Sequence, residues 1–224
     1  TKKIVKRGVT ELVTPGVAFN DDILHSKSNN FLAAVHFDKR YIGVSFLDIS
    51  TGEFLTSQGN AEYIDKLLQS FQPKEVLYER SQQAYFIETF GKQLYSYKLD
   101  DWVFQEDYTN DILLKHFKVK SLKGFGIESL KQATIAAGTA LHYLAETQHN
   151  KTQHIANISR IEEDNFVWLD RFTIRNLELI GSNNNDATTL AHVIDKTVSP
   201  MGARLLKRWM LLPLKDVSKI NKRL

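Results

Sequence analysis

The sequence predicts a layered α/β domain, with a mixed β-sheet and helices on both faces, followed by an all-α segment. Three apolar runs at 31–37, 41–47 and 53–57 are separated by short polar turns, which is typical of an antiparallel meander. Polar and apolar residues alternate only incompletely within the central run, and this indicates that its strand is buried on both faces. From residue 164 onward the pattern is helical with no further strand signal.

Two helix–strand pairs are expected after the meander. Asn60 is a suitable N-cap, and the apolar residues behind it share one helical face until Pro73. Ser81 is the predicted N-cap of the second helix, which should end at Gly91. The paired strands are predicted at 74–79 and 94–99. The order β-β-β-α-β-α-β fits a mixed sheet with helices on both faces.

Two further helices complete the predicted α/β domain. Residues 105–117 form a surface helix with a narrow apolar edge, and 128–148 is the longest helix in the prediction. Small residues should allow the longer helix to lie close against the sheet; they are Ala133, Ala136, Ala137, Gly138 and Ala140. A hinge or loop is expected at 124–126, and 155–161 is predicted to be a short extended piece.

The all-α segment has a capping residue before each predicted helix. The caps are Asp170, Thr188 or Thr189, Ser199 and Asp216. In the second of these helices Leu190, Val193 and Ile194 are expected to face inward. The third runs to Leu212 and is amphipathic. Its basic side holds Arg204, Lys207 and Arg208, and its apolar side holds Met201, Leu205, Trp209 and Leu212. The basic side suits either a solvated face or contact with DNA phosphates.

Composition excludes several classes of protein. Cysteine is absent, so a disulfide framework and a thiolate metal site are impossible, and an intracellular location is favoured. No signal peptide or membrane-length apolar run is present, so we expect a soluble, cytoplasmic protein with no membrane partner. Lysine and arginine exceed aspartate and glutamate by 29 − 26 = 3, too few to indicate nucleic-acid binding. The basic residues cluster between Lys196 and Arg223, which leaves a generic DNA-binding module as a third hypothesis.

The sequence gives little support for a reactive centre. The predicted strand order is also that of ribonuclease-H-like nucleases, whose carboxylates hold two divalent ions. That chemistry needs an acid inside the first strand, and residues 32–36 contain none. Asp48, Glu53 and Glu79 lie at or beside strand ends, so a metal-dependent nuclease with a helical extension stays as the alternative. No P-loop, G-x-S-x-G elbow or i,i+4 histidine pair occurs, and we predict no catalytic, cofactor or metal residues.

Six stretches carry a resemblance that extends from one end of the chain to the other. They are Val9–Gly16, Asn30–Ala34, Leu47–Phe54, Leu122–Gly126, Leu169–Leu179 and Thr197–Leu214. The chain resembles the connector domain and the beginning of the core, or lever, domain of the MutS family of DNA mismatch-repair proteins. The resemblance implies a ribonuclease-H-like connector at 16–165 and the first lever helices at 166–224. It also implies that 1–15 arrives from a mismatch-reading domain.

In that family the mismatch reader, the DNA clamp and a P-loop ATPase that uses ATP and Mg lie outside these residues. The resemblance therefore implies a non-catalytic piece of a DNA-dependent ATPase that binds mismatched duplex DNA as a homodimer. The string Phe86-Ile-Glu88 matches the family's Phe-x-Glu mismatch motif. We reject that match because Phe86 lies on the inward side of a predicted helix and the family's flanking glycine is absent.

A connector of this family couples the distant ATPase to the mismatch reader and docks the partner protein MutL. These roles require a rigid sheet, hinges at both ends and an outer helix that faces the partner. We place the hinges at 14–30 and 149–165. For contact with MutL we favour Asn110, Asp111 and Lys115 on the predicted surface helix. The basic helix of the lever should be architectural, with its charges felt by DNA at long range.

Overall fold

A six-stranded mixed sheet forms the centre of the computed structural model, which describes residues 14–17, 29–148, 152–162, 165–182, 184 and 187–224. The strands are β1 (Phe31–Phe37), β2 (Ile42–Asp48), β3 (Glu53–Gly59), β4 (Glu75–Glu79), β5 (Ser96–Leu99) and β6 (Ser159–Arg160). Their order across the sheet is β5-β4-β1-β2-β3-β6. The first three strands are antiparallel, while β4 runs parallel to β1 and β5 to β4. The predicted meander and the mixed sheet are confirmed.

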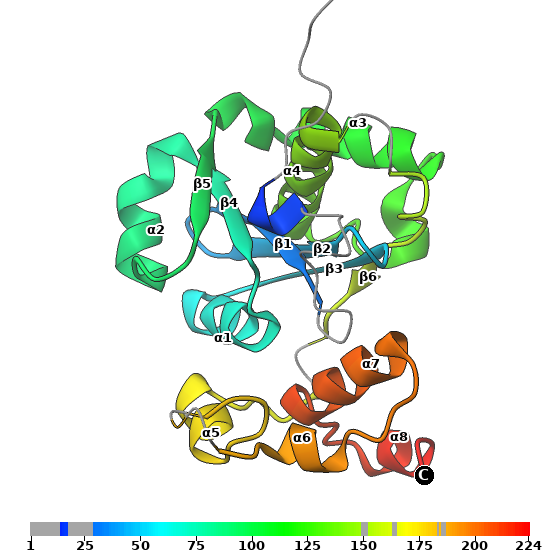
Figure 1. Ribbon diagram of the computed structural model, residues 1–224. Coiled ribbons are helices and arrows are strands. Elements are labelled where there is room, and N and C mark those ends of the chain that lie inside the picture. The colour runs from blue at the N-terminus through cyan, green and yellow to red at the C-terminus, as the bar shows by residue number, and fades with distance from the viewer. Residues whose placement is uncertain (1–13, 18–28, 149–151, 163–164, 183, 185–186) are drawn as a thin grey trace, which may run out of the picture.

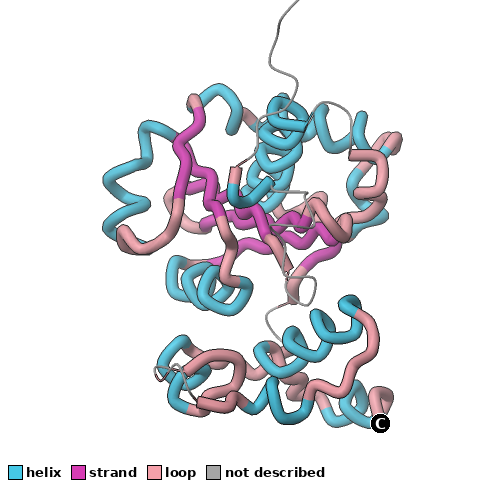
Figure 2. Tube along the Cα trace, in the orientation of Figure 1, coloured by secondary structure: helices cyan, strands magenta, loops and turns pink. Residues whose placement is uncertain are grey.

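Eight α-helices lie within the described residues. They are α1 (Ala61–Phe71), α2 (Gln83–Phe90), α3 (Glu106–Phe117), α4 (Lys131–Gln148), α5 (Arg171–Asn176), α6 (Leu190–Ile194), α7 (Pro200–Leu211) and α8 (Val217–Asn221). Figure 1 shows α1 and α4 on opposite faces of the sheet, with α3 beside α4 and α5 to α8 in a separate group. Figure 2 shows that the long strands all belong to the first of these two parts. The order β-β-β-α-β-α-β is therefore confirmed.

Strand β1 shows why the sheet is buried on both faces. Leu32 and Ala34 point into the core shared with α3 and α4. Phe31, Ala33 and Val35 point into the opposite core, which α1 and α2 cover. Since side chains alternate between the two faces of a strand, a strand covered on both sides must be apolar throughout. Every residue of β2 is likewise buried, as the incomplete alternation predicted.

The close approach of α4 to the sheet depends on a glycine in the strand as well as on small residues in the helix. A Cβ atom built on Gly43 of β2 would lie 2.1 Å from the carbonyl carbon and oxygen of Gln132. Gly138, expected to face the sheet, lies instead against Thr109 of α3, where a Cβ would approach the threonine Cβ to 2.4 Å. Helix α4 therefore approaches both β2 and α3 closely, and small residues are needed at both contacts.

Most predicted caps are confirmed. The side chains of Asn60, Asp170 and Ser199 accept hydrogen bonds from backbone amides in the first turns of their helices, as do those of Thr189 and Asp216. The prediction for Ser81 was wrong, because that residue lies inside a 3-10 turn ahead of α2 and makes no side-chain cap. Gly91 follows α2 with φ +81°, a conformation that glycine adopts without strain.

The helical segment buries less apolar surface than the sequence predicts. Leu190, Val193 and Ile194 of α6 were expected to face inward, yet 44%, 55% and 43% of their surfaces are exposed. The described residues of this segment form one small apolar cluster centred on Ile174, Leu211 and Leu212. Ala191 is the buried residue of α6, at 6% exposed, so the helix turns that side inward and leaves the predicted face outside. Phe166 adds one isolated antiparallel bridge to Leu214.

Candidate functional site

The acid at the end of β2 closes a turn rather than offering ligands to a metal. Asp48 is fully buried, and its Oδ1 accepts from the amide of Ser50 at 3.0 Å, from its hydroxyl at 2.6 Å and from the amide of Thr51 at 3.3 Å. Its Oδ2 accepts from Asn29 Nδ2 at 2.8 Å and from the amide of Asn30 at 3.2 Å. Five donors hydrogen-bond to the carboxylate, so Asp48 joins the turn between β2 and β3 to the residues just before β1.

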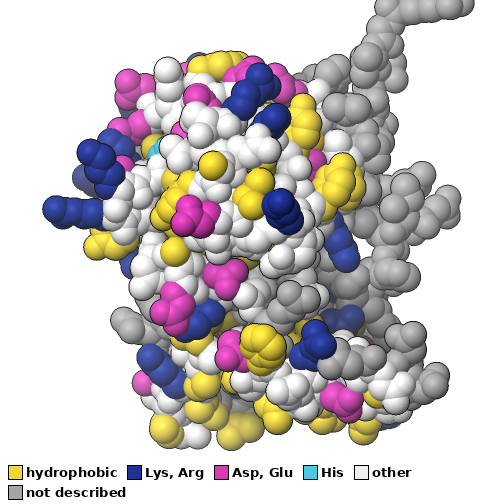
Figure 3. Space-filling model, turned by 90° about the vertical axis from the view of Figure 1, so that its left-hand side faces the viewer, with side chains coloured by type: hydrophobic (Ala, Val, Ile, Leu, Met, Phe, Trp, Pro, Cys, Tyr) yellow, Lys and Arg dark blue, Asp and Glu magenta, His cyan; other side chains and the backbone are white. Residues whose placement is uncertain are grey.

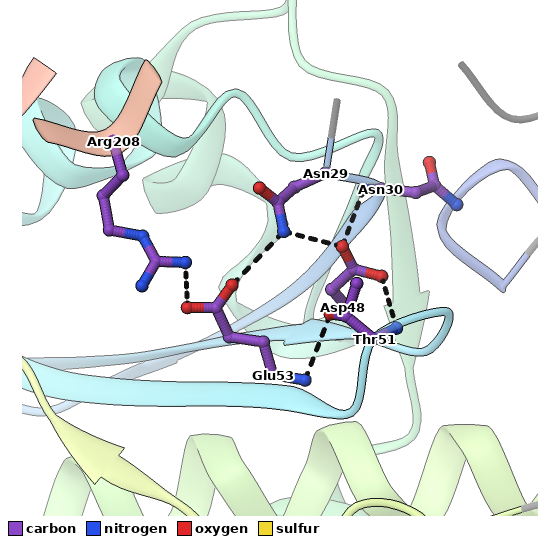
Figure 4. A network of polar contacts seen from close by, with 6 residues as sticks. All are labelled: Asn29, Asn30, Asp48, Thr51, Glu53 and Arg208. Atoms are coloured by element: carbon purple, nitrogen blue, oxygen red, sulfur yellow. Dashed lines mark hydrogen bonds and ion pairs between the residues drawn. The ribbon is translucent and has the colours of Figure 1, made fainter. Parts of the chain in front are cut away.

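Glu53 extends this network to the helical segment (Figure 4). Asn29 Nδ2 also donates to Glu53 Oε2 at 3.2 Å, and Glu53 Oε1 forms an ion pair with a guanidinium nitrogen of Arg208 on α7. Only 19% of the Glu53 side chain and 32% of the Arg208 side chain are exposed. Because both side chains are partly buried, solvent and salt screen this ion pair less than one on an open surface. It ties α7 to the β2–β3 turn.

The same end of the sheet holds the segment that precedes it. Asn30 Nδ2 donates to the carbonyl oxygen of Pro15 at 3.0 Å. Glu75, the first residue of β4, accepts from Thr14 Oγ1 at 2.5 Å, from the Gly16 amide at 3.1 Å and from the Tyr143 hydroxyl at 3.0 Å. Burial is the main cause that raises the pKa of Tyr143, so its phenol remains a donor.

These contacts form one continuous polar network at one end of the sheet. It runs from Pro15 through Asn30, Asp48 and Asn29 to Glu53 and Arg208. We call it the sheet-end network. From the sequence, Arg208 was expected only as a DNA contact and Glu53 only as a candidate metal ligand, and Asn29 was missed. The one signal for Asn29 was its place just before the first strand.

Apolar contacts support the junction between the sheet and the helical segment. Phe71, the last residue of α1, stacks on Phe46 of the sheet core with ring centroids 4.5 Å apart, and it also packs against the helical cluster. Trp168 meets Tyr63 edge to face at 5.1 Å. Aromatic contacts thus hold the two parts together beside the ion pair.

The three acids considered for a nuclease do not meet. Asp48 and Glu53 lie at the end of the sheet where β1 begins, because Asp48 is opposite both Phe31 and Glu53. Glu79 lies beside the other end of β1, with a carboxylate oxygen 3.2 Å from His36 Nδ1. Five residues of strand separate the ends by about 16 Å. Within the described ranges no three His, Asp or Glu side chains could hold a metal ion, and the nuclease alternative is not supported.

The basic side of α7 faces the junction. Arg204, Lys207 and Arg208 all line a cavity of about 130 Å³ between α7 and the end of α1. On the opposite side of the helix Met201 and Leu205 are exposed, and the guanidinium of Arg223 lies 4.3 Å from the ring centroid of Trp209. Figure 3 shows basic and acidic side chains interspersed over one face of the molecule. The three residues predicted to contact DNA are thus together, and Arg208 has an acidic partner within the chain.

The residues predicted to bind a partner lie on α3, two of them on its outer side. Asp111 and Lys115 are exposed and form an i,i+4 ion pair at 2.5 Å. Asn110 lines a polar hollow with Glu106, Asp107 and residues of the following loop. Leu113 on the inner side is fully buried. The helix is therefore anchored by its inner face and presents Asp111 and Lys115 on its outer face, with the half-exposed Asn110 at the side; their role in binding stays a prediction.

A buried histidine between α3 and α4 makes stability depend on pH. His142 Nδ1 lies 2.8 Å from the Tyr108 hydroxyl, and Nε2 lies 3.4 Å from a Glu146 oxygen. Burial lowers the pKa of His142, and the Glu146 charge opposes this only in part.

The lowered pKa of His142 predicts that the protein becomes less stable in acid. Below about pH 6.5 the imidazole takes up a proton in the unfolded chain but resists it in the folded chain, so the free energy of unfolding should decrease as the pH is lowered. Urea unfolding of the wild type and His142→Gln at pH 7.5 and pH 5.5 should show a smaller loss in the variant; equal losses would contradict the assignment.

Comparison with known proteins agrees with this architecture. The family model described as MutS domain II matches residues 30–156, and the model for MutS domain III matches 172–224. The chain is 63% identical over 224 residues to the DNA mismatch repair protein MutS of Christiangramia forsetii and 59% identical over 224 residues to that of Bacteroides fragilis. Both matches cover 100% of this chain but 26% of the relative. The chain therefore spans about a quarter of the length of these relatives.

The mixed sheet with helices on both faces, followed by a helical segment, is the fold of a ribonuclease-H-like domain of a DNA mismatch-repair protein. The chain belongs to the MutS family of DNA mismatch-repair proteins. It contains domain II and the matched part of domain III. The predicted division at 165 and 166 lies between the two matches, and its position stays a prediction. None of the described helices combines the length and hydropathy needed to cross a lipid bilayer.

Proposed function

We propose that this chain couples the ATPase of a MutS-type protein to its mismatch-reading domain. The ATPase, with its ATP and Mg, and the mismatch reader would lie in the remaining length of the parent. The parent would act as a homodimer on mismatched duplex DNA in the cytoplasm. The chain itself would contribute no catalytic residue. Membership of the family supports this proposal, because its named relatives are DNA mismatch repair proteins.

One observation carries the mechanical part of the proposal: the sheet-end network attaches the incoming segment and the outgoing helices to the same end of one rigid sheet. Pro15 is bound through Asn30, and α7 is bound through Glu53. A displacement of α7 would therefore pull on the carboxylate that shares Asn29 with Asp48. Coupling of this kind needs a packed element with discrete contacts on both sides, which the buried sheet supplies.

Each predicted hinge lies partly outside the described residues. Residues 18–28 of the first hinge and 149–151 and 163–164 of the second lie outside the described residues. The described parts of the first hinge, 14–17 and 29–30, are hydrogen-bonded to the sheet. In the second hinge, residues 159–161 of the described part 152–162 are bonded to β3, and the carbonyl of Asn165 accepts from the amide of Lys215.

Reversal of the charge of Arg208 tests the coupling. In the full-length protein, Arg208→Glu should place two carboxylates together and slow ATP-dependent release of mismatched DNA by about fivefold or more. Mismatch affinity without nucleotide should stay unchanged. The double variant Glu53→Arg with Arg208→Glu restores opposite charges and should recover the rate. Lys222→Glu is the matched control, because it makes the same change in charge at an exposed position just after α8. A rate unaffected by Arg208→Glu would contradict the coupling role.

For MutL we propose the outer side of α3 as a docking surface, through Asn110, Asp111 and Lys115. The exposed Asp111–Lys115 pair and the polar hollow beside Asn110 support this choice. The double variant Asp111→Lys with Lys115→Glu keeps an ion pair on the helix but exchanges the positions of the positive and negative charges that a partner would contact. Weaker binding of full-length protein to MutL in a pull-down assay would support the surface, and unchanged binding would place the contact elsewhere.

Contact of α7 with DNA phosphates remains a second proposal. Its support is the clustering of Arg204, Lys207 and Arg208 on one side of the helix. Because Arg208 is paired with Glu53, DNA contact at this residue competes with the junction. Duplex affinity that falls with salt, and that Lys207→Glu reduces, would favour it.

A further inference from the structure

Strand β5 leaves one edge of the sheet open. It is the last strand in the sheet order, and its other side is paired with β4 in parallel. The amide of Val76 donates at 3.0 Å to the carbonyl of Tyr95, just before β5, so Tyr95 and the residues that alternate with it direct their backbone groups to β4. Ser96 and Lys98 therefore direct theirs to the open side, where no described strand pairs with them. An edge of this kind can accept a further strand.

The groove beside this edge on the α4 side is aromatic and acidic. Its volume is about 650 Å³, and Tyr95 and Tyr97, which line it, are 60% and 51% exposed. The ring centroid of Tyr97 lies 5.9 Å from that of Tyr143 on α4. The lining also contains the carboxylates of Glu75 and Glu146 and, among the described residues, no basic side chain. A cation is attracted both by the face of a tyrosine ring and by a carboxylate.

The charge of Glu146 is the one that a ligand would meet. Its side chain is 59% exposed, and one of its oxygens lies 3.4 Å from His142 Nε2. Burial lowers the pKa of His142, so the imidazole is uncharged at neutral pH and does not offset the carboxylate. Glu75 is buried and its carboxylate accepts from the incoming segment, so it contributes negative potential rather than a direct contact.

The groove on the opposite face of β5 has the opposite charge. It lies between β5 and α2 and has a volume of about 390 Å³. Its charged side chains are Lys92 and Lys98, and no acidic side chain lines it among the described residues. Lys98 donates to Gln83 Oε1 at 3.3 Å, a neutral acceptor that leaves the ammonium charge in place. Since the side chains of a strand alternate between two faces, a strand added to β5 would place successive side chains in oppositely charged grooves.

We propose that β5 binds an extended peptide segment of another protein that carries basic and acidic side chains at alternate positions. The backbone of the segment would pair with the outward groups of Ser96 and Lys98. Its basic side chains would lie in the groove that contains Glu146, and its acidic side chains would lie in the groove that contains Lys92. In this mode of recognition main-chain hydrogen bonds supply affinity, and pockets for alternate side chains supply specificity. The site shares no residue with the α3 surface and does not depend on the proposed coupling role.

Binding of a synthetic peptide to the full-length protein tests the open edge. The probe is a labelled hexapeptide of alternating arginine and glutamate, and its control contains three arginines followed by three glutamates. The control has the same composition but cannot place all its basic side chains on one face of a strand. Fluorescence anisotropy at physiological ionic strength should show saturable binding of the alternating peptide and binding of the control that is weaker by about tenfold or more.

The backbone contact is tested from both sides. Ser96→Pro removes one outward N–H, and proline is tolerated where the amide of an edge strand faces solvent. This variant should bind the alternating peptide about tenfold more weakly, whereas Ser96→Ala, which keeps the amide, should bind it like the wild type. Thermal unfolding shows whether both variants are folded. Methylation of the backbone nitrogens of the peptide removes its donors without any change in the protein, and it should abolish binding.

The charge of the groove is tested by Glu146→Gln, which leaves the backbone of β5 intact. This variant should bind the alternating peptide about fivefold more weakly. Glu62→Gln on α1 is the matched control, because it neutralises an exposed carboxylate away from β5, and it should bind like the wild type. The inference is overturned if the control peptide or the methylated peptide binds as tightly as the alternating one, or if Glu146→Gln binds as Glu62→Gln does.

Discussion

Gly43→Ala should destabilise the fold by about 3 kcal/mol, the upper range for overpacking a buried site. The added methyl group would lie 2.1 Å from backbone atoms of Gln132 and 2.6 Å from the amide nitrogen of Ala133. Backbone cannot yield in the way a flexible side chain can. The strand cannot retreat either, because β2 is paired with β1 and β3 along its whole length. The helix must therefore move away from the sheet.

Movement of α4 would break the hydrogen bonds that fix it. Thr56 Oγ1 donates to the Ala133 carbonyl at 3.0 Å, and Ser45 Oγ donates to that of Ala136 at 2.9 Å. Urea unfolding gives the loss of free energy, and amide exchange in the first turns of α4 shows where it arises. Gly124→Ala is the matched control, because no described atom lies within 4 Å of the position that its added methyl group would take. Equal stability of the two variants would disprove the close approach.

The sequence of β2 contained a signal for the close contact between β2 and α4. A glycine inside a strand often marks a site where another backbone comes close, and Gly43 lies within the apolar run 41–47. The prediction from the sequence assigned the close approach to the helix alone, through its alanines and Gly138. The sequence shows which residues of the helix are small, but helical periodicity does not show which neighbouring element each of them contacts. Gly138 consequently turned out to face α3.

Local patterns predicted the fold well because each depends on residues close together in the chain. The Asn60 cap, the stop at Pro73 and the apolar run of β1 are each set within one element. The sheet-end network depends on residues from four separate segments. Glu53 and Arg208 have no shared pattern in the sequence, and the one signal for Asn29 is its place just before the first strand. Such long-range pairs follow from the packing of whole elements, which periodicity does not specify.

Glu75→Ala should release the incoming segment from the sheet and lower the unfolding free energy by about 2–4 kcal/mol. Glu75 is 1% exposed, and its carboxylate accepts from Thr14, Gly16 and Tyr143. Its removal leaves the Gly16 amide and the Tyr143 hydroxyl without their acceptor in a buried place, which costs more than the loss of a surface contact. Glu75→Gln keeps one acceptor oxygen and should lie between the wild type and alanine.

Two measurements distinguish this release from general damage. Hydrogen exchange of the Gly16 amide should accelerate in Glu75→Ala more than exchange in the centre of β2, because the described part of the segment is held to the sheet by Glu75 and by the bond from Asn30 to Pro15. Glu88→Ala, an exposed carboxylate on α2, should change stability by less than about 0.5 kcal/mol. If the Gly16 amide stays protected in Glu75→Ala, the segment is held by other contacts.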